Sequence, residues 1–160
     1  LPKFVYNTSL GLTYKNFNFY IFWQGAGGNN KMLSGSAIYE PRREKGRFLD
    51  VHMSRWTEER WKNGEKILYP RLASNENQYT RQNNTFFMRK GDYLRLKNVE
   101  FSYTFKKSKF LNLNSTRVYI GGTNLLTFDY IKNFDPEMGK LDGFFYPQSK
   151  TWRLGVDINF

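Results

Sequence analysis

Side chains that could carry out acid–base or metal chemistry are few and widely spaced. His52 is the only histidine and cysteine is absent, so a histidine metal cluster, a thiolate site or a Ser-His-Asp arrangement cannot be drawn from this chain alone. Glu58 and Glu59 lie together in a charged stretch, while Asp135 and Glu137 lack the repeated acidic spacing of a calcium-binding loop. We therefore expect no enzymatic activity, no metal and no cofactor, and interpret Asp135 and Glu137 as turn and loop-capping residues.

Aromatic side chains are stronger candidates for binding. Residues 26–85 form a polar region that is long for a connection and shows no strand pattern, which is typical of a functional loop. Its aromatic rings could stack on sugar rings or hold peptide side chains, or they could pack within the loop or against a lid protein. Residues 49–62 predict one short helix, with Asp50 as its cap. The candidate contacts to substrate or lid are Trp56, Trp61, Tyr69 and Tyr79.

Alternation of apolar and polar residues marks the β-strands that must position these side chains. Lys15-Asn16 gives a two-residue turn between the first two strands. In the third strand, Leu94 and Leu96 are out of phase with the residues after them, which requires a bulge near Lys97-Asn98 or a change of environment. The expected strands lie near 4–14, 17–25, 86–105, 115–124 and 150–160.

The connections between these strands alternate short, long, short and long. The long ones are expected near 26–85 and 129–148. Membrane β-barrels have this asymmetry, because their turns on one side of the membrane are tight while their outer loops are large. Soluble β-sandwiches rarely keep it.

The composition agrees with strands that cross a membrane. Aromatic residues make up 19% of the chain and hydrophobic residues 39%, so about half of the apolar content is aromatic. The mean hydropathy is -0.70, and no apolar run reaches the about 20 residues that a membrane helix needs. A membrane strand needs only about 9 to 11 residues, of which alternate ones face lipid.

The net charge of +11 suggests nucleic acid at first sight. However, the basic residues are scattered through candidate loops and turns, and no segment has the signature of an RNA-binding sheet. A basic rim beside anionic lipid headgroups, or a solvated loop surface, accounts for the charge equally well. We expect no nucleic acid partner.

These patterns favour an all-β fold, an antiparallel transmembrane β-barrel fragment. Backbone groups inside hydrocarbon must all pair, so strands cross only within a closed sheet whose alternate residues face lipid and lumen. Five strands cannot close such a barrel, which needs at least about 8, and the chain begins without Met, so we expect a piece of a longer protein. The alternative is a soluble β-rich carbohydrate-binding module. The residues expected to face lipid are Leu10, Leu12, Phe17, Phe19, Ile21, Trp23, Val99, Phe101, Tyr103, Val118 and Ile120.

Several short strings occur in order along the chain. The most specific combination is GDYLRLKNV from Gly91, GTNLLT from Gly122, the triplet Asp135-Pro136-Glu137 and the closing LGVDINF from Leu154. This combination resembles the C-terminal barrel portion of SusC/RagA-like TonB-linked outer-membrane proteins, which are TonB-dependent receptors. The resemblance extends over nearly the whole chain.

The resemblance implies a fold, a location and partners. It implies the last five strands of a barrel of about 22 strands in the cell outer membrane. The implied activity is import of nutrients such as oligosaccharides or peptides. The implied partners are the remainder of the barrel and its plug, a SusD-like lipoprotein lid, membrane lipid, and the TonB complex through an N-terminal part; we see neither plug nor TonB-box here.

The closing strand also resembles an assembly signal. Its alternating apolar residues end in an aromatic residue, as in the C-terminal insertion signal that the outer-membrane assembly machinery recognises, although the same residues could simply face lipid. The residues of this expected signal are Trp152, Leu154, Val156, Ile158 and Phe160.

Overall fold

The computed structural model describes residues 1–35, 38–40, 48–73, 78–108 and 113–159. The predicted fold class is confirmed, because these residues form mostly antiparallel strands and only short helices. The chain divides into two compact units. The strand unit comprises Leu1–Asn30, Lys90–Pro136 and Pro147–Phe160, and the loop unit comprises Lys31–Arg89 and Glu137–Tyr146.

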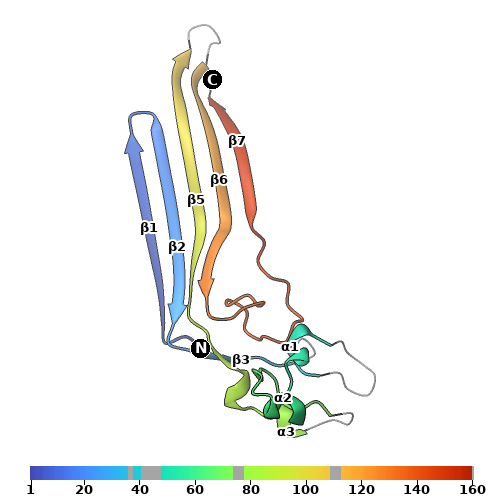
Figure 1. The fold of residues 1–160 in the computed structure, drawn as a ribbon. Coiled ribbons are helices and arrows are strands. Elements are labelled where there is room, and N and C mark those ends of the chain that lie inside the picture. The colour runs from blue at the N-terminus through green and yellow to red at the C-terminus, as the bar shows by residue number, and fades with distance from the viewer. Residues whose placement is uncertain (36–37, 41–47, 74–77, 109–112, 160) are drawn as a thin grey trace. The chain divides into compact units, whose positions relative to one another are not determined.

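The strand unit is built on a five-stranded antiparallel sheet in the order β1-β2-β5-β6-β7 (Figure 1). Strands that are neighbours along the chain are therefore also neighbours in the sheet, as in a meander. The strands are β1 (Phe4–Tyr14), β2 (Phe17–Gly27), β5 (Tyr93–Ser108), β6 (Leu113–Asp129) and β7 (Thr151–Asn159).

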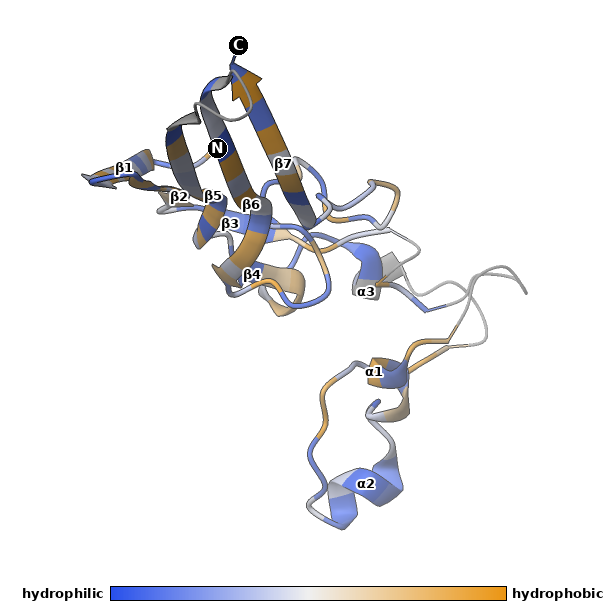
Figure 2. Cartoon of the chain, turned by 90° about the horizontal axis from the view of Figure 1, so that it is seen from above, coloured by the Kyte–Doolittle hydropathy of each residue, from blue (hydrophilic) through white to orange (hydrophobic). Residues whose placement is uncertain are grey.

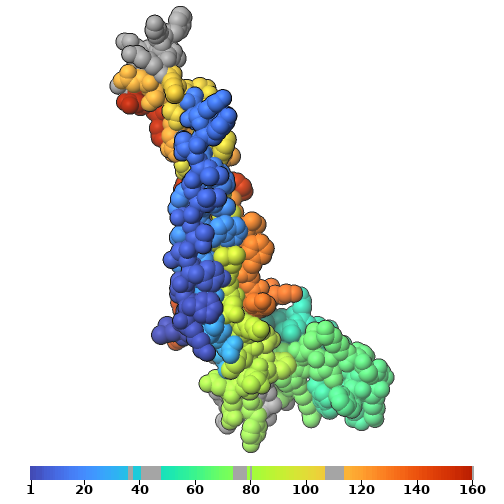
Figure 3. Space-filling model, turned by 90° about the vertical axis from the view of Figure 1, so that its left-hand side faces the viewer, coloured from blue at the N-terminus to red at the C-terminus, as the bar shows by residue number. Residues whose placement is uncertain are grey.

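The first hairpin turns at the two residues that the sequence marks as a turn. Tyr14 pairs with Phe17, and Lys15 adopts a positive φ of 55°, the conformation that tight two-residue hairpins require. The outer edge of β1 lies uncovered along its length in Figure 3, and every residue of β1 is exposed. Within the described residues, β1 and β7 are the edges of the sheet.

The strand expected at 86–105 is interrupted. Thr85–Phe87 forms a 3-10 turn, Met88–Lys90 forms the short strand β4, and β5 begins only at Tyr93. The interruption falls at Gly91 and Asp92, because the Gly91 N–H donates to the Asn29 carbonyl at 2.8 Å and Asp92 accepts from the Gly28 N–H at 2.8 Å. β5 and β6 also extend beyond the predicted ends at 105 and 124.

The loop unit contains short elements. These are β3 (Asn30–Met32), which pairs with β4, α1 (Asp50–Met53), α2 (Glu58–Lys62) and α3 (Gln78–Arg81). Its core comprises Leu33, His52, Tyr69, Phe87 and Leu141, all of which are buried. The region 26–85 is therefore a packed loop with elements of its own, not a featureless connection.

The prediction of a single helix at 49–62 is wrong, because two separate short helices occupy this segment. The chain leaves the helix after Met53, since the Trp56 N–H donates to the Tyr69 carbonyl at 2.9 Å instead of to a helical partner. A second helix then starts behind Thr57, whose hydroxyl accepts from the Arg60 N–H at 3.2 Å. Asp50 is not the cap either, because Leu49 occupies that position.

Aromatic rings lie over glycines of the neighbouring strand at three places in the sheet. A Cβ atom added at Gly25 would overlap the ring of Tyr6, which sits opposite it in β1. Gly27 has the same relation to Phe4, and Gly155 to Tyr119. The Tyr6 hydroxyl then reaches the Tyr93 carbonyl at 3.1 Å, so the missing side chain lets one ring link β1 to β5 across β2.

Gly25→Ala should loosen the sheet. The added methyl group would displace the Tyr6 ring and break its hydrogen bond to Tyr93, and overpacking of this kind costs about 1–3 kcal/mol. Protease resistance of the full-length protein measures the effect. Gly11→Ala is the matched control, because no atom lies within 4 Å of the added Cβ. Equal resistance of the two variants would contradict the role assigned to the Tyr6 ring.

Candidate functional site

The register of the sheet collects the large apolar side chains on one face, here called the apolar face. Residues directly opposite each other in antiparallel strands point to the same side. One row across the sheet is Leu12, Phe19, Phe101, Ile120 and Leu154, and the next is Tyr14, Phe17, Tyr103, Val118 and Val156. All residues expected to face lipid share this face, and the alternation is visible as bands of colour along β7 in Figure 2.

The described residues leave much of the apolar face uncovered. Phe101 is 46% exposed, Ile120 49% and Leu154 76%. A soluble protein rarely exposes such large apolar side chains side by side, so a face of this kind is usually a contact surface for a membrane or a partner. Contact with lipid itself stays a prediction.

A bulge at Lys97 keeps the apolar face continuous. Ile21 pairs with Val99, but two residues further along β2, Trp23 pairs with Leu96, so Lys97 is an extra residue in β5. The register between β5 and β6 also shifts at this place, between Leu96 and Asn98. Without the bulge, Leu94 and Leu96 would point to the opposite face. The predicted bulge is therefore confirmed.

On the opposite face, here called the polar face, a group of four charged residues neutralise one another. Glu100 on β5 forms ion pairs with Arg117 on β6 and with Arg153 on β7, the latter at 2.9 Å. Arg117 also forms an ion pair with Asp157 at 3.0 Å. Two arginines and two carboxylates therefore join three strands with no net charge.

A glycine makes room for this arrangement. Gly121 lies between Glu100 and Arg153 in the row that crosses the sheet. A Cβ atom at this position would be 2.9 Å from the Val99 carbonyl oxygen and 3.0 Å from the Nε atom of Arg153. Because Gly121 has no side chain, the Arg153 guanidinium can pass over β6 to reach a carboxylate two strands away.

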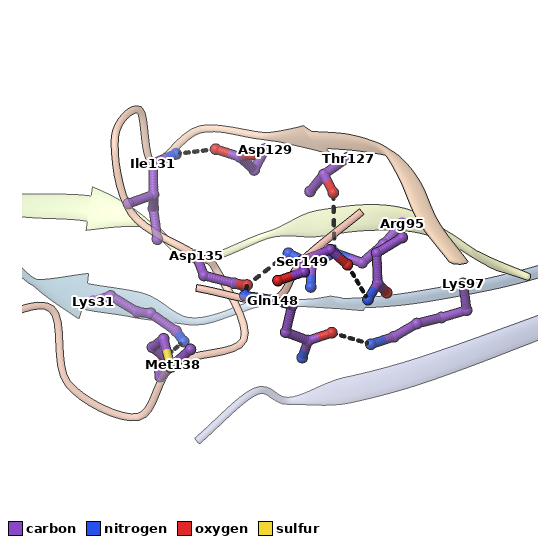
Figure 4. A network of polar contacts seen from close by, with 11 residues as sticks. Lys31, Arg95, Lys97, Thr127, Asp129, Ile131, Asp135, Met138, Gln148 and Ser149 are labelled. Carbon is purple, nitrogen blue, oxygen red and sulfur yellow. Dashed lines mark hydrogen bonds and ion pairs between the residues drawn. The ribbon is translucent and has the colours of Figure 1, made fainter. Parts of the chain in front are cut away.

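A second polar network holds the 129–148 loop to the sheet (Figure 4). Arg95 on β5 donates to the Thr127 hydroxyl at 3.0 Å and to Asp135 at 2.7 Å. Asp135 accepts the Gln148 N–H at 3.0 Å, and the Gln148 side chain accepts from Lys97 at 3.0 Å. Arg95 and Asp135 are both only 4% exposed at their side chains.

The interpretation of Asp135 as a turn and capping residue needs correction. Its carboxylate is a buried ion-pair partner that ties the loop to β5 and β6. The Asp-Pro-Glu triplet gives no sign of this pairing, because Arg95 is far away in the sequence. The bulge is related to it, since the extra residue Lys97 contributes its ammonium to the same network.

The expected insertion signal lies on an edge strand. Trp152, Leu154, Val156 and Ile158 all point to the apolar face of β7 and are between 51% and 76% exposed. Phe160 lies outside the described residues. The structure thus presents the alternating side chains on one side of an unpaired edge, whereas recognition by an assembly machinery stays a prediction.

The four candidate aromatic contacts of the loop unit separate into two groups. Trp61 is 68% exposed and Tyr79 82%, while Trp56 is 37% exposed. Tyr69 is only 2% exposed, so its ring is not available for contact with a solute in this structure, and the assignment of Tyr69 as a contact residue is corrected. Other side chains of the loop unit, rather than solvent, surround it.

Tyr69 is the centre of an aromatic cluster. Its ring packs against His52, with 4.5 Å between centroids, and against Phe86 and Phe87. Its hydroxyl donates to Glu40 at 3.0 Å. Burial raises the pKa of Tyr69 above its usual range, and the adjacent Glu40 carboxylate raises the pKa further.

Sequence reasoning missed one group of exposed aromatics. Phe144, Phe145 and Tyr146 follow one another in the loop unit and are 77%, 52% and 85% exposed. The Asp142 carboxylate accepts the Phe144 N–H at 3.1 Å, which fixes the start of this segment. The sequence feature that could have predicted this group is the run of three consecutive aromatic residues after Gly143.

The described residues contain neither a group of metal ligands nor a membrane-spanning helix. No group of three or more His, Asp or Glu side chains is placed there to hold a metal ion. Among the same residues, no helix is both long enough and apolar enough to cross a membrane.

The sheet and its two faces define the class of this structure, an antiparallel β-sheet of the outer-membrane barrel type. Comparison with solved structures agrees. The RagAB peptide importer in its open-open state matches the whole chain with a TM-score of 0.76 and 25% identity. The RagAB peptide transporter matches 95% of the chain with a TM-score of 0.71 and 27% identity. In both cases the match covers 17% of the larger chain.

Two curated proteins with similar sequences are TonB-dependent receptors. TonB-dependent receptor P26 of Formosa agariphila is 29% identical over the whole chain, and TonB-dependent receptor P3 of the same organism is 27% identical over 99% of it. The chain spans 17% and 16% of the lengths of these relatives. No family model matches. The resemblance to SusC/RagA-like, TonB-dependent receptors is confirmed.

Asp135→Asn should release the 129–148 loop. The substitution removes the carboxylate charge that pairs with the buried Arg95 guanidinium, and breaking a buried pair costs about 3–5 kcal/mol. The measurement is the rate of protease cleavage in this loop of the full-length protein. The control is Glu58→Gln, which removes an exposed helical pair with Lys62 worth about 0.3–0.5 kcal/mol. Similar cleavage rates for the two variants would contradict the anchoring role.

The loop unit should lose stability in alkali. The folded state favours the neutral Tyr69 phenol, whereas the unfolded chain ionises at the ordinary tyrosine pKa of about 10. Stability from this group is therefore present below about pH 10 and falls as the pH rises further. Protease sensitivity of the loop unit between pH 9 and 11 measures it. Tyr69→Phe should show a weaker pH dependence, and an unchanged dependence would refute the assignment.

Proposed function

We propose that this chain is the last five strands of the barrel of a TonB-dependent importer in the cell outer membrane. The observation that carries the proposal is the two-faced sheet. One face presents large exposed apolar residues in rows, and the other presents a neutralised set of charges. A sheet with lipid on one side and a polar lumen on the other requires this division.

The similarity of the whole chain to parts of TonB-dependent receptors supports the proposal. The open edges of the sheet support a larger barrel around these strands, because β1 and β7 both leave backbone groups unpaired within the described residues. Remaining strands would pair with these edges. In this arrangement β7 supplies the insertion signal, while the loop unit and the 129–148 loop lie on the outer side of the membrane.

The proposed cargo is a nutrient oligosaccharide or peptide. RagAB, to which the chain is similar, is a peptide importer, and the name RagAB denotes two components. We propose by analogy a SusD-like lipoprotein lid, with the exposed rings of Trp56, Trp61 and Tyr79 as contacts to lid or cargo. The plug and the segment that meets the TonB complex would be supplied by other parts of the protein.

A soluble carbohydrate-binding module is the second candidate. Exposed aromatic residues on the loop unit favour it. It offers no account of the apolar face, whose exposed rows would make such a module aggregate in water. The importer is therefore the better explanation.

Two substitutions at adjacent residues of β1 test the proposal. Leu10→Arg places a charge on the apolar face, where a lipid-facing arginine costs about 2–4 kcal/mol near the membrane centre. Ser9→Arg places the same charge on the polar face and is the matched control. We expect Leu10→Arg to reduce the amount of full-length protein in the outer-membrane fraction, with Ser9→Arg close to the wild type.

Nutrient uptake is the second part of the test. Deletion of the gene should abolish growth that depends on energised uptake of one class of oligosaccharide or peptide. A gene that encodes the Ser9→Arg variant should restore this growth. A wild-type protein found in the soluble fraction, with both arginine variants equally abundant there, would overturn the importer and favour the binding module.

A further inference from the structure

The excess positive charge of the strand unit is carried by lysines. The sequence of this unit contains 12 Lys and Arg residues and five Asp and Glu residues. Its three arginines are Arg95, Arg117 and Arg153, and each forms an ion pair with a carboxylate of the same unit. These pairs use three of the five carboxylates, so nine lysines remain beside Asp92 and Asp129.

Four of these lysines lie near one end of the sheet, here called the outer end. At this end β1, β5 and β7 begin, and β2 and β6 end (Figure 1). All four lysines are exposed, and none forms an ion pair with another described residue. They are Lys3 before β1, Lys90 at the end of β4, Lys132 after β6 and Lys150 before β7.

The length of β1 matches the thickness of a membrane. Phe4 and Tyr14 are its first and last residues, ten positions apart, and both point to the apolar face. At about 3.4 Å per residue and a strand tilt of about 40°, these two rings are about 26 Å apart along the membrane normal. The apolar band of a membrane barrel is about 25 Å tall and lies between two aromatic girdles. In the membrane location proposed above, the outer end is therefore level with the lipid headgroups.

Aromatic rings accompany the lysines at the outer end. On the apolar face, the rings of Trp23 and Phe128 stack with 6.3 Å between centroids. Tyr130 follows directly after β6 and is 63% exposed, and the Lys90 ammonium lies 5.6 Å from the centre of its ring. An amphipathic ring sits well between headgroup and acyl chain, while the long stem of a lysine carries its charge outward to the headgroup.

The carboxylates near the outer end do not cancel the charge of the four lysines. Asp92 accepts the Gly28 N–H and Asp129 accepts the Ile131 N–H, both at 2.8 Å. Four lysines and two carboxylates give a local net charge of +2. The sequence of the loop unit contains 13 Lys and Arg residues and nine Asp and Glu residues, so its net charge has the same sign.

We propose that the outer end of the sheet binds a phosphate-bearing lipid of the surrounding membrane. The acyl chains of the lipid lie on the apolar face against Phe128, and its phosphate accepts hydrogen bonds from the Lys90 ammonium and its neighbouring lysines. Lysine suits this ligand because it binds phosphate as a compact charge with several donors. The proposal rests on the membrane location proposed above, and it adds a lipid ligand to the cargo of the importer.

Lipid binding to the purified full-length protein in an uncharged detergent tests the proposal. The probes are dioleoyl phosphatidic acid and dioleoylglycerol, which have the same acyl chains and differ in the phosphate. Native mass spectrometry measures the affinity for each. We expect phosphatidic acid to bind at least about tenfold more tightly. Inorganic phosphate in excess should not displace it, because it has no acyl chain to contact the apolar face.

Variants assign the binding to the outer end. A triple variant with Lys90→Gln, Lys132→Gln and Lys150→Gln should bind phosphatidic acid at least about tenfold more weakly, with dioleoylglycerol unaffected. Replacing the same three lysines by arginine keeps the charge and should keep most of the affinity. The matched control is a triple variant in the loop unit, which removes the same charge from exposed lysines and should bind like the wild type: Lys62→Gln, Lys66→Gln and Lys140→Gln.

Three results would overturn the inference. One is equal affinity of the wild type for the two lipids, and another is displacement of phosphatidic acid by inorganic phosphate. The third is an equal loss of affinity in the two glutamine variants, which would show a general effect of net charge. A protein that selects no lipid can still reach the outer membrane and import its cargo. Failure of the lipid proposal is therefore distinguishable from failure of the importer proposal, which the localisation and uptake experiments decide.

Discussion

The backbone register between neighbouring strands determines what every side chain of the sheet can do. A slip of one residue between β2 and β5 would move Phe101 and Tyr103 to the polar face and bring Glu100 among apolar residues. The bulge at Lys97 is part of the same constraint, because it restores the phase for Leu94 and Leu96. The two faces are consequences of pairing, and the pairing in turn is favoured because only one register separates apolar from charged residues.

Three arginines of the sheet form ion pairs with nearby carboxylates, although the chain as a whole is basic. On the polar face, Glu100 is shared between Arg117 and Arg153, so neither guanidinium lies beside the sheet without a carboxylate. Beside β5, Arg95 meets Asp135 in a buried pair that also organises the loop connecting β6 and β7. The surplus of positive charge in the sequence is therefore not concentrated on the sheet among the residues that the structure describes.

Much of the sheet could be predicted from the sequence, because a period of two is a local property. The hairpin at Lys15 and the phase change before Val99 are both visible in short windows. Contacts between distant residues are not. Nothing near Asp135 indicates Arg95, and nothing near Tyr69 indicates that it is buried against His52 and Glu40. The helix at 49–62 failed for the same reason, since its interruption depends on a hydrogen bond from Trp56 to a residue outside the predicted segment.

Gly121 illustrates how an absent side chain can connect positions that lie far apart in the chain. Any residue with a Cβ at this point would crowd the Val99 carbonyl and the path of Arg153 to Glu100. Residues 100, 121 and 153 are therefore not free to change independently during evolution. A lineage that acquires a larger residue at 121 would gain nothing from retaining an arginine at 153, and once that arginine is gone the carboxylate at 100 has one partner fewer. Substitutions at these three positions, which lie on three neighbouring strands, should therefore be correlated among related sequences.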